Sequence, residues 1–188
     1  MQSNGNYQGK LKVREIVFMG IMIALDVLAV RFLSFEIPTM RIGLGFLAIM
    51  ISGMYLGPLR AGAVALIADL LGFVLFGKGI FFPGFTISAM VNGLIAGHFL
   101  EGKKSAKVYN YVLFALLSTL VVDTLMNTTW LVMMLHNNDF SYFMARLIPR
   151  VPNQIIVTVL KIIMAPLLYK TLFKRFVARD VEHKGIRE

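Results

Sequence analysis

The chain contains no cysteine and few charged residues. Of its 188 residues, 15% are Asp, Glu, Lys or Arg, whereas 57% are hydrophobic and the mean hydropathy is +0.74. The lack of cysteine excludes disulfides and thiolate metal sites. About a quarter of the residues in a typical soluble domain are charged, so this chain has too little charge to cover a water-facing surface. These deficits argue against a soluble globular protein.

Motifs for catalysis, metal binding and nucleotide binding are also missing. The chain has no GxSxG nucleophile motif, and its three histidines show no ligand spacing. The segment GFVLFGKG at 72–79 imitates a phosphate-binding loop, but Gly79 replaces the Ser or Thr that would bind Mg²⁺. We therefore expect neither a metal ion nor a cofactor.

Long apolar stretches dominate the sequence instead. Several are about 20 residues long, which is enough to cross a hydrocarbon layer roughly 30 Å thick. Breakers such as Gly57-Pro58 separate them. The pattern predicts an all-α, polytopic membrane protein with one domain, 1–188, and six transmembrane helices at residues 13–33, 43–57, 59–76, 84–100, 108–135 and 145–173.

The basic residues give the expected orientation. Thirteen of the 19 Lys and Arg residues fall on one side, in the two tails, in the connections after the second and fourth spans, and at the span ends next to them, which carry Arg14, Arg60 and Lys170. Cytoplasmic loops gather basic residues, so we expect both termini in the cytoplasm and the connections 34–42, 77–83 and 136–144 outside. The net charge of +9 is explained by this topology, and no basic stripe for nucleic acid is present.

Polar side chains inside the spans are the candidates for a binding site. An ionisable group at membrane depth costs at least about 2.5 kcal/mol, so it is expected to face the bundle interior. Asp123, Asn127 and Trp130 share one helical stripe of the fifth span. The other polar residues in the spans are Asp26, Asp69, Asn92, Arg146, Arg150, Asn153, Gln154 and Lys161.

Depth within the spans suggests one pocket that opens outward. Carboxylates accept hydrogen bonds from ring N–H groups, aromatic faces stack on rings, and arginines bind carboxylates. The expected ligand is a flat heteroaromatic molecule with an anionic tail. Two alternatives stay open: the Asp and Arg side chains neutralise one another between helices, and Trp130 is an aromatic residue of the membrane interface.

The first span carries a ridge of small residues. Gly20 and Ala24 are four residues apart, and Asp26 points about 200° away from Ala24 around the helix. The ridge fits either a partner helix or a contact within the bundle. The chain has no inverted repeat and no ATP-binding motif, so uphill transport would need an ion gradient or a separate ATPase.

Three segments resemble the substrate-binding S components of energy-coupling factor (ECF) vitamin transporters, and most of all the folate-specific ones. They are LSFEIPTMRIGLGFLAI, SGMYLGPLRAGAVALIADLLG and FFPGFTISA; NTTWL and ARLIPRVPNQ add support. The resemblance runs from about Lys12 to Phe176. The family more often has a shorter spacing around the proline of ARLIPRVPNQ, which leaves Arg146 and Arg150 as alternatives.

The resemblance implies a six-helix protein that binds folate from outside. It also implies partners, namely a transmembrane coupling subunit and two cytoplasmic ATPases. Gly20 and Ala24 match the small residues that contact the coupling subunit, and the stretch 34–41 matches a gate over the pocket.

Together these arguments give the following expected site. The polar ring edge is bound by Asp69, Asn92, Asp123 and Asn127, the ring stacks on Phe82, Phe85 and Trp130, and the carboxylates are bound by Arg41, Arg146 and Arg150. The alternatives are an S component for riboflavin, thiamine or another heteroaromatic vitamin, and an intramembrane enzyme that uses Asp69 and Asp123 as an acid–base or metal-binding pair.

Overall fold

The computed structural model describes residues 13–32, 34–37, 40–77, 81–102, 107–136 and 140–173. These residues are helical apart from one short hairpin. The elements are α1 (Val13–Phe32), β1 (Ser34–Ile37), β2 (Met40–Gly43), α2 (Gly45–Leu56), α3 (Pro58–Phe76), α4 (Pro83–Leu100), α5 (Val108–Leu117), η2 (Ser118–Met126), α6 (Asn127–His136), α7 (Phe140–Leu147), η3 (Ile148–Arg150), α8 (Val151–Leu168) and η4 (Tyr169–Phe173).

The predicted spans agree with these helices within two residues, except at the start of the sixth. The fifth span is continuous through α5, the π-helical segment η2 and α6. The sixth begins at Phe140 rather than at residue 145, because the 3₁₀ turn η3 carries the chain past Pro149 into α8. By length and composition, three helices are long and apolar enough to cross a membrane: Pro58–Phe76, Val108–Met134 and Tyr142–Thr171.

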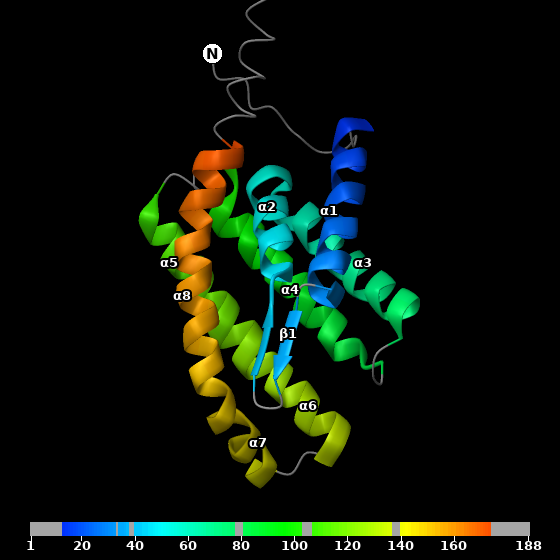
Figure 1. The fold of residues 1–188 in the computed structure, drawn as a ribbon, viewed down its shortest axis with the longest axis vertical. Helices are drawn as coiled ribbons and strands as arrows, with labels where there is room; N and C mark the ends of the chain where they lie inside the picture. The colour runs from blue at the N-terminus through cyan, green and yellow to red at the C-terminus, as the bar shows by residue number, and fades with distance from the viewer. Residues whose placement is uncertain are drawn as a thin grey trace, which may run out of the picture.

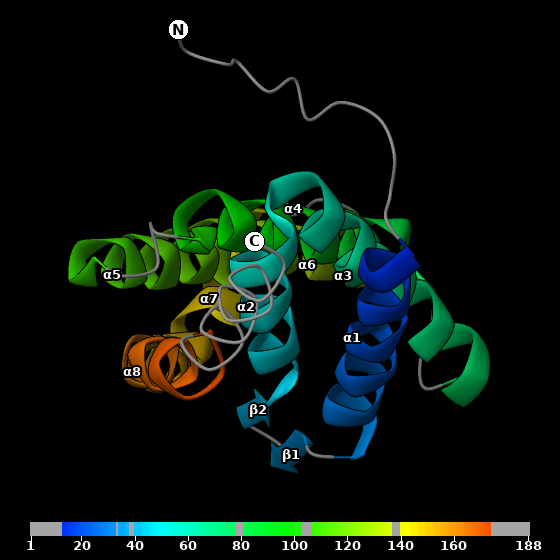
Figure 2. The same cartoon turned by 90° about the horizontal axis from the view of Figure 1, so that it is seen from above.

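The helices run along the long axis of a bundle. The start of α1 and the end of η4 lie at the same end, whereas α7 lies at the opposite end (Figure 1). Viewed along this axis, α2 lies between α1 and α8, and α3, α4 and α5 lie along the other side (Figure 2). Among the described elements α4 is central, because it contacts α2, α3, α5, η2 and α6.

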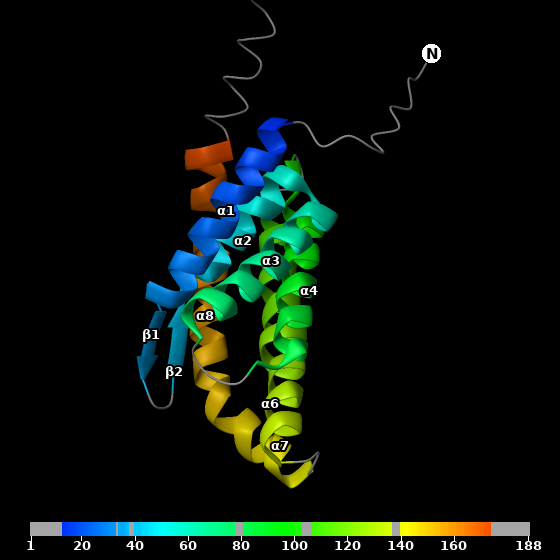
Figure 3. The same cartoon turned by 90° about the vertical axis from the view of Figure 1, so that its right-hand side faces the viewer.

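The connection 34–42 forms secondary structure that was not predicted. Strands β1 and β2 pair antiparallel, with Ser34 opposite Gly43 and Glu36 opposite Arg41. A two-stranded hairpin is marginally stable alone. Here it is joined directly to α1 and α2 and β2 contacts α8, so the bundle holds it in place (Figure 3).

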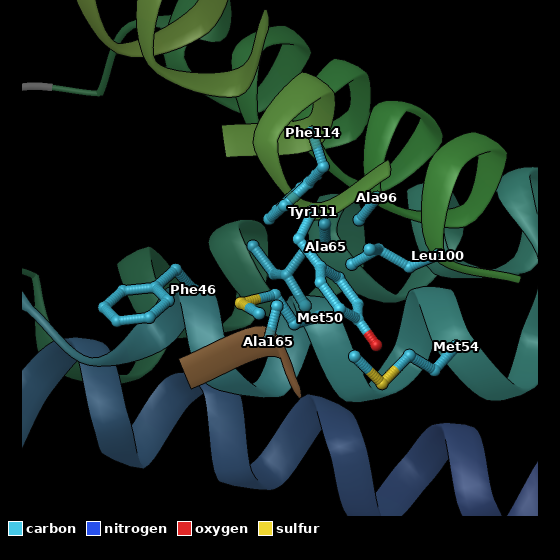
Figure 4. Close-up of a cluster of buried hydrophobic side chains, with 10 residues drawn as sticks. Phe46, Met50, Met54, Ala65, Ala96, Leu100, Tyr111, Phe114 and Ala165 are labelled. Carbon is cyan, nitrogen blue, oxygen red and sulfur yellow. The ribbon is translucent and has the colours of Figure 1, made fainter. Parts of the chain in front are cut away.

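The apolar core occupies the half of the bundle nearest the described chain ends. Met50 and Met54 of α2 pack there with Ala96 and Leu100 of α4 and with Phe114 of α5 (Figure 4). The first half of α4 buries polar side chains instead, at Thr86, Ser88 and Asn92. The buried surface therefore changes from apolar to polar along one helix.

Candidate functional site

Three aromatic rings gather around the start of α4. The ring centroids of Phe82 and Trp130 are 5.9 Å apart, and those of Phe82 and Phe85 are 6.1 Å apart in an edge-to-face arrangement. The indole Nε1 of Trp130 donates a 3.0 Å hydrogen bond to Ser88 Oγ. This bond fixes the plane of the indole against α4, so the three predicted stacking residues form one aromatic cluster.

Gly84 allows this cluster to form. A Cβ atom at position 84 would lie 2.5 Å from Trp130 Cδ2 and 2.6 Å from Phe82 Cε1. Any side chain there would displace one of the two rings. The FPGFT element of the sequence thus provides two of the aromatic residues together with the space for the third.

A buried lysine organises the polar groups at the middle of the bundle. Lys161 Nζ on α8 donates to Ser118 Oγ and to Asp123 Oδ2, each at 2.7 Å, and to Thr119 Oγ1 at 3.4 Å. Ser118 Oγ in turn donates to Asn92 Oδ1 at 2.7 Å. Hydrogen bonds thus connect α4, η2 and α8, and they bring the predicted residues Asn92 and Asp123 into one network.

The predicted stripe of Asp123, Asn127 and Trp130 on the fifth span assumed 3.6 residues per turn, but residues 118–126 are π-helical. Asp123 contacts Lys161 of α8, and Trp130 contacts Ser88 of α4. Between them, the Oδ1 atom of Asn127 is buried without a hydrogen-bond partner. A buried carbonyl oxygen of this kind is available to a ligand or a water molecule.

The predicted arginines differ in their surroundings. Arg150 is half-buried, and its Nη1 donates a 3.1 Å hydrogen bond to Thr128 Oγ1 of α6. Arg146 is exposed on α7. The side chain of Arg41 lies outside the described part of the structure. Arg150 is thus the arginine with a described contact to the helix that carries Trp130.

Asp69 of α3 bonds to α4 away from the lysine network. Its Oδ2 accepts a 2.7 Å hydrogen bond from Thr86 Oγ1. Thr86 is six residues from Asn92, the α4 residue of the lysine network, and such a spacing places two side chains about 120° apart around a helix. Asp69 and Asp123 thus bind separate partners, so the acid–base pair required by the enzyme alternative has no direct contact among the described hydrogen bonds.

The first helix contributes Asp26, which was a candidate in the sequence but was given no role in the expected site. Asp26 is 5% exposed, and its Oδ1 has no hydrogen-bond partner. The Nε atom of Arg31 is also buried without a partner. Gly20 and Ala24 of the same helix are exposed, and a Cβ at position 20 would meet nothing within 4 Å. The predicted partner-contact residues thus lie on the outside of the bundle.

Within the described residues, no three His, Cys, Asp or Glu side chains form a group that could hold a metal ion.

Lys161, which anchors the hydrogen-bond network, was a polar candidate in the sequence but was given no role in the expected site. Its role depends on the π-helical geometry of η2, which leaves no signal in composition or hydropathy.

Comparison with known proteins decides the family. A family model described as "ECF transporter, substrate-specific component" matches residues 14–169. The chain belongs to this family. This S component is therefore a multi-pass membrane transport protein with a six-helix fold, and the family resemblance expected from the sequence is confirmed.

Two curated relatives of the chain are named folate transporters. The S component is 44% identical over 120 residues to the "Folate transporter FolT" of Clostridium novyi (strain NT), covering 64% of this chain and 69% of the relative. It is 30% identical over 150 residues to the protein of the same name from Leuconostoc mesenteroides subsp. mesenteroides, covering 78% and 80%. A solved structure, "Crystal structure of FolT bound with folic acid", superposes with a TM-score of 0.73 at 30% identity, covering 84% and 92%.

Proposed function

We propose that this S component captures folate or a related pteridine outside the cell and delivers it inward. The observation that carries the proposal is the likeness to FolT bound with folic acid, which extends over 84% of this chain. Two relatives are also named folate transporters. The chain acts as one substrate-binding domain and not as an enzyme.

The aromatic cluster and the lysine network supply the ring site. Phe82, Phe85 and Trp130 provide apolar faces on which a pterin or benzoyl ring stacks. Asn92, Asp123 and Asn127 bind the polar edge of the pterin ring. Two observations support this assignment, since the Asp123 side chain is 24% exposed and Asn127 Oδ1 has no hydrogen-bond partner. Asp69 is also proposed to bind the ring edge, beside its hydrogen bond to Thr86 near the start of α4.

The arginines bind the glutamate carboxylates of folate. Arg150, Arg146 and Arg41 are the proposed contacts, because a guanidinium binds a carboxylate through two parallel hydrogen bonds. Arg150 bonds to Thr128 of α6, the helix that carries Trp130. Arg146 is exposed and precedes Arg150 by about one helical turn. The glutamate tail would thus extend from the rings toward the α7 end of the bundle.

Orientation and partners complete the proposal. Both termini lie in the cytoplasm, so the α7 end and the hairpin face outward, and the stretch 34–41 gates the site. The energy comes from two cytoplasmic ATPases through a transmembrane coupling subunit. Gly20 and Ala24 contact that subunit, which is supported by their exposure on α1.

A thermal-shift panel tests the ligand. Detergent-solubilised protein is heated with folic acid, riboflavin or thiamine at equal concentrations. A ligand that binds only the folded state stabilises it by about 4 kcal/mol at a thousand times its Kd, so folic acid should raise the unfolding temperature while the other two do not. Equal or larger shifts with riboflavin or thiamine would assign the protein to another vitamin and overturn the folate proposal.

A further inference from the structure

The hydrogen bonds of Lys161 suggest a role beyond structural support. Lys161 is 1% exposed, and its ammonium group has three N–H donors for its three acceptors, Ser118, Thr119 and Asp123. All three acceptors belong to the π-helical segment η2. The buried ammonium group is therefore hydrogen-bonded by one short stretch of the fifth span.

The π-helical geometry is what lets one ammonium group reach both Ser118 and Asp123. Ser118 and Asp123 are five residues apart, and in an α-helix that spacing would separate them by ~140° around the axis. In a π-helix the hydrogen bonds join residues five apart, so the two side chains come to the same side of the helix. The hydrogen bonds of Lys161 and the π-helical geometry of η2 thus stabilise each other.

The lysine leaves one Asp123 oxygen free of the ion pair. Oδ2 accepts the 2.7 Å bond from Lys161, and the side chain retains 24% of its exposure, while the lysine side chain retains 2%. A carboxylate held in this way presents its second oxygen as a fixed, charged acceptor. Charged acceptors make short, strong hydrogen bonds to N–H groups.

We propose that Lys161 is a positioning residue that aims the Asp123 carboxylate at an N–H donor on the ligand's heteroaromatic ring. The inference rests on the proposed function, and it assigns specificity for rings that carry an exocyclic amino donor. Lys161 does not touch the ligand. It acts through Asp123 and, by way of Ser118, through Asn92.

Two ligands test this role. Folic acid carries the exocyclic amino group at C2 of the pterin, and 2-desamino-2-methylfolic acid has a methyl group there instead. Calorimetric titration of the wild type should show folic acid binding about tenfold more tightly or better, as expected when a charged acceptor loses its donor. In Lys161→Met the ratio of the two Kd values should fall to within about threefold, because the carboxylate is no longer aimed.

Further variants separate positioning from stability. Ser118→Ala keeps the ion pair but removes one hydrogen-bond acceptor of the ammonium group. The ratio of the two Kd values should therefore lie between those of the wild type and Lys161→Met. Thr158→Val is the matched control on α8, since its hydroxyl bonds within its own helix to the Gln154 carbonyl, and it should keep the wild-type ratio. If Lys161→Met does not fold, Ser118→Ala carries the test, because it keeps both charges of the ion pair.

The outcomes that contradict the inference are distinct from failure of the proposed function. A wild type that binds folic acid but does not distinguish the two ligands would overturn the role of Asp123. An unchanged ratio in Lys161→Met, or in Ser118→Ala where Lys161→Met does not fold, would make Lys161 purely structural. Absence of folic acid binding by the wild type would instead refute the proposed function itself.

Discussion

At the scale of single residues, Gly84 shows how tightly the aromatic cluster is built. The position faces two rings at once, and the nearest atoms belong to the middle of the Trp130 side chain rather than to its flexible end. The indole is also fixed by its bond to Ser88. A single methyl group at this position would therefore move the ring as a whole.

We predict that Gly84→Ala weakens folic acid binding by roughly 5- to 30-fold, because it displaces the indole from Phe82 and from Ser88, each contact contributing about 1 kcal/mol. Isothermal titration calorimetry measures the change in Kd. Ser88→Ala serves as the comparison, since it removes the indole's hydrogen-bond acceptor without filling space, and its effect should be smaller. An unchanged Kd in Gly84→Ala would show that the aromatic cluster does not contribute to the site.

At the scale of helices, α3 and α4 are joined by backbone contact. A Cβ atom at Gly93 would meet the carbonyl oxygen of Ala61, and it would lie 2.7 Å from the Ala61 carbonyl carbon and 2.8 Å from Gly62 Cα. Because these are backbone atoms, no side chain can move aside. The two helices would have to separate, and the polar side chains that α4 holds would shift with them.

Gly93→Ala should therefore lower stability by about 1–3 kcal/mol, the usual cost of forcing extra volume into a packed interior. For a chain of this size, each kcal/mol corresponds to about 2–4 °C in the unfolding temperature, which a thermal scan of the solubilised protein would detect. Gly20→Ala is the matched control, because a Cβ there meets nothing within 4 Å. Equal unfolding temperatures for the two variants would contradict the close packing.

The sequence allowed the helices to be predicted better than their internal geometry. Spans were visible because about 20 apolar residues are needed to cross a bilayer, and breakers such as Gly57-Pro58 mark their ends. The π-helix at Ser118–Met126 could not be predicted, since it differs from an α-helix in hydrogen bonding rather than in composition. The predicted stripe of Asp123, Asn127 and Trp130 therefore assumed α-helical spacing where part of the span is π-helical.

At the scale of the whole molecule, the bundle separates two kinds of interior. Apolar residues such as Met50 and Leu100 fill the half near the start of α1 and the end of η4, and the polar network lies toward the middle of the bundle. The cost of burying charge was sufficient to predict that Asp26 and Lys161 are buried, but Arg146 is exposed. It was not sufficient to predict which residues meet, because the bonds of Asp69 to Thr86 and of Asp123 to Lys161 depend on how the helices pack.

The outer face of α1 gives a prediction for transport. Gly20→Leu should leave folic acid binding unchanged, because position 20 is exposed, but it should reduce ATP-dependent folate uptake several-fold by holding a partner helix away. Uptake of radiolabelled folate by cells that also produce the coupling subunit and ATPases measures the effect. Ile21→Leu, a change of similar exposure without added bulk, is the control. Normal uptake in Gly20→Leu would mean that this ridge faces only lipid.

Because Trp130 packs against Phe82 and Ser88, the intrinsic fluorescence of the protein reports on this site. The chain has one tryptophan, so its indole emission originates entirely from the ring cluster at the start of α4. A bound molecule that stacks on this indole alters its intensity or wavelength without any attached dye. Capture and release during a transport cycle can therefore be followed in real time on the native chain.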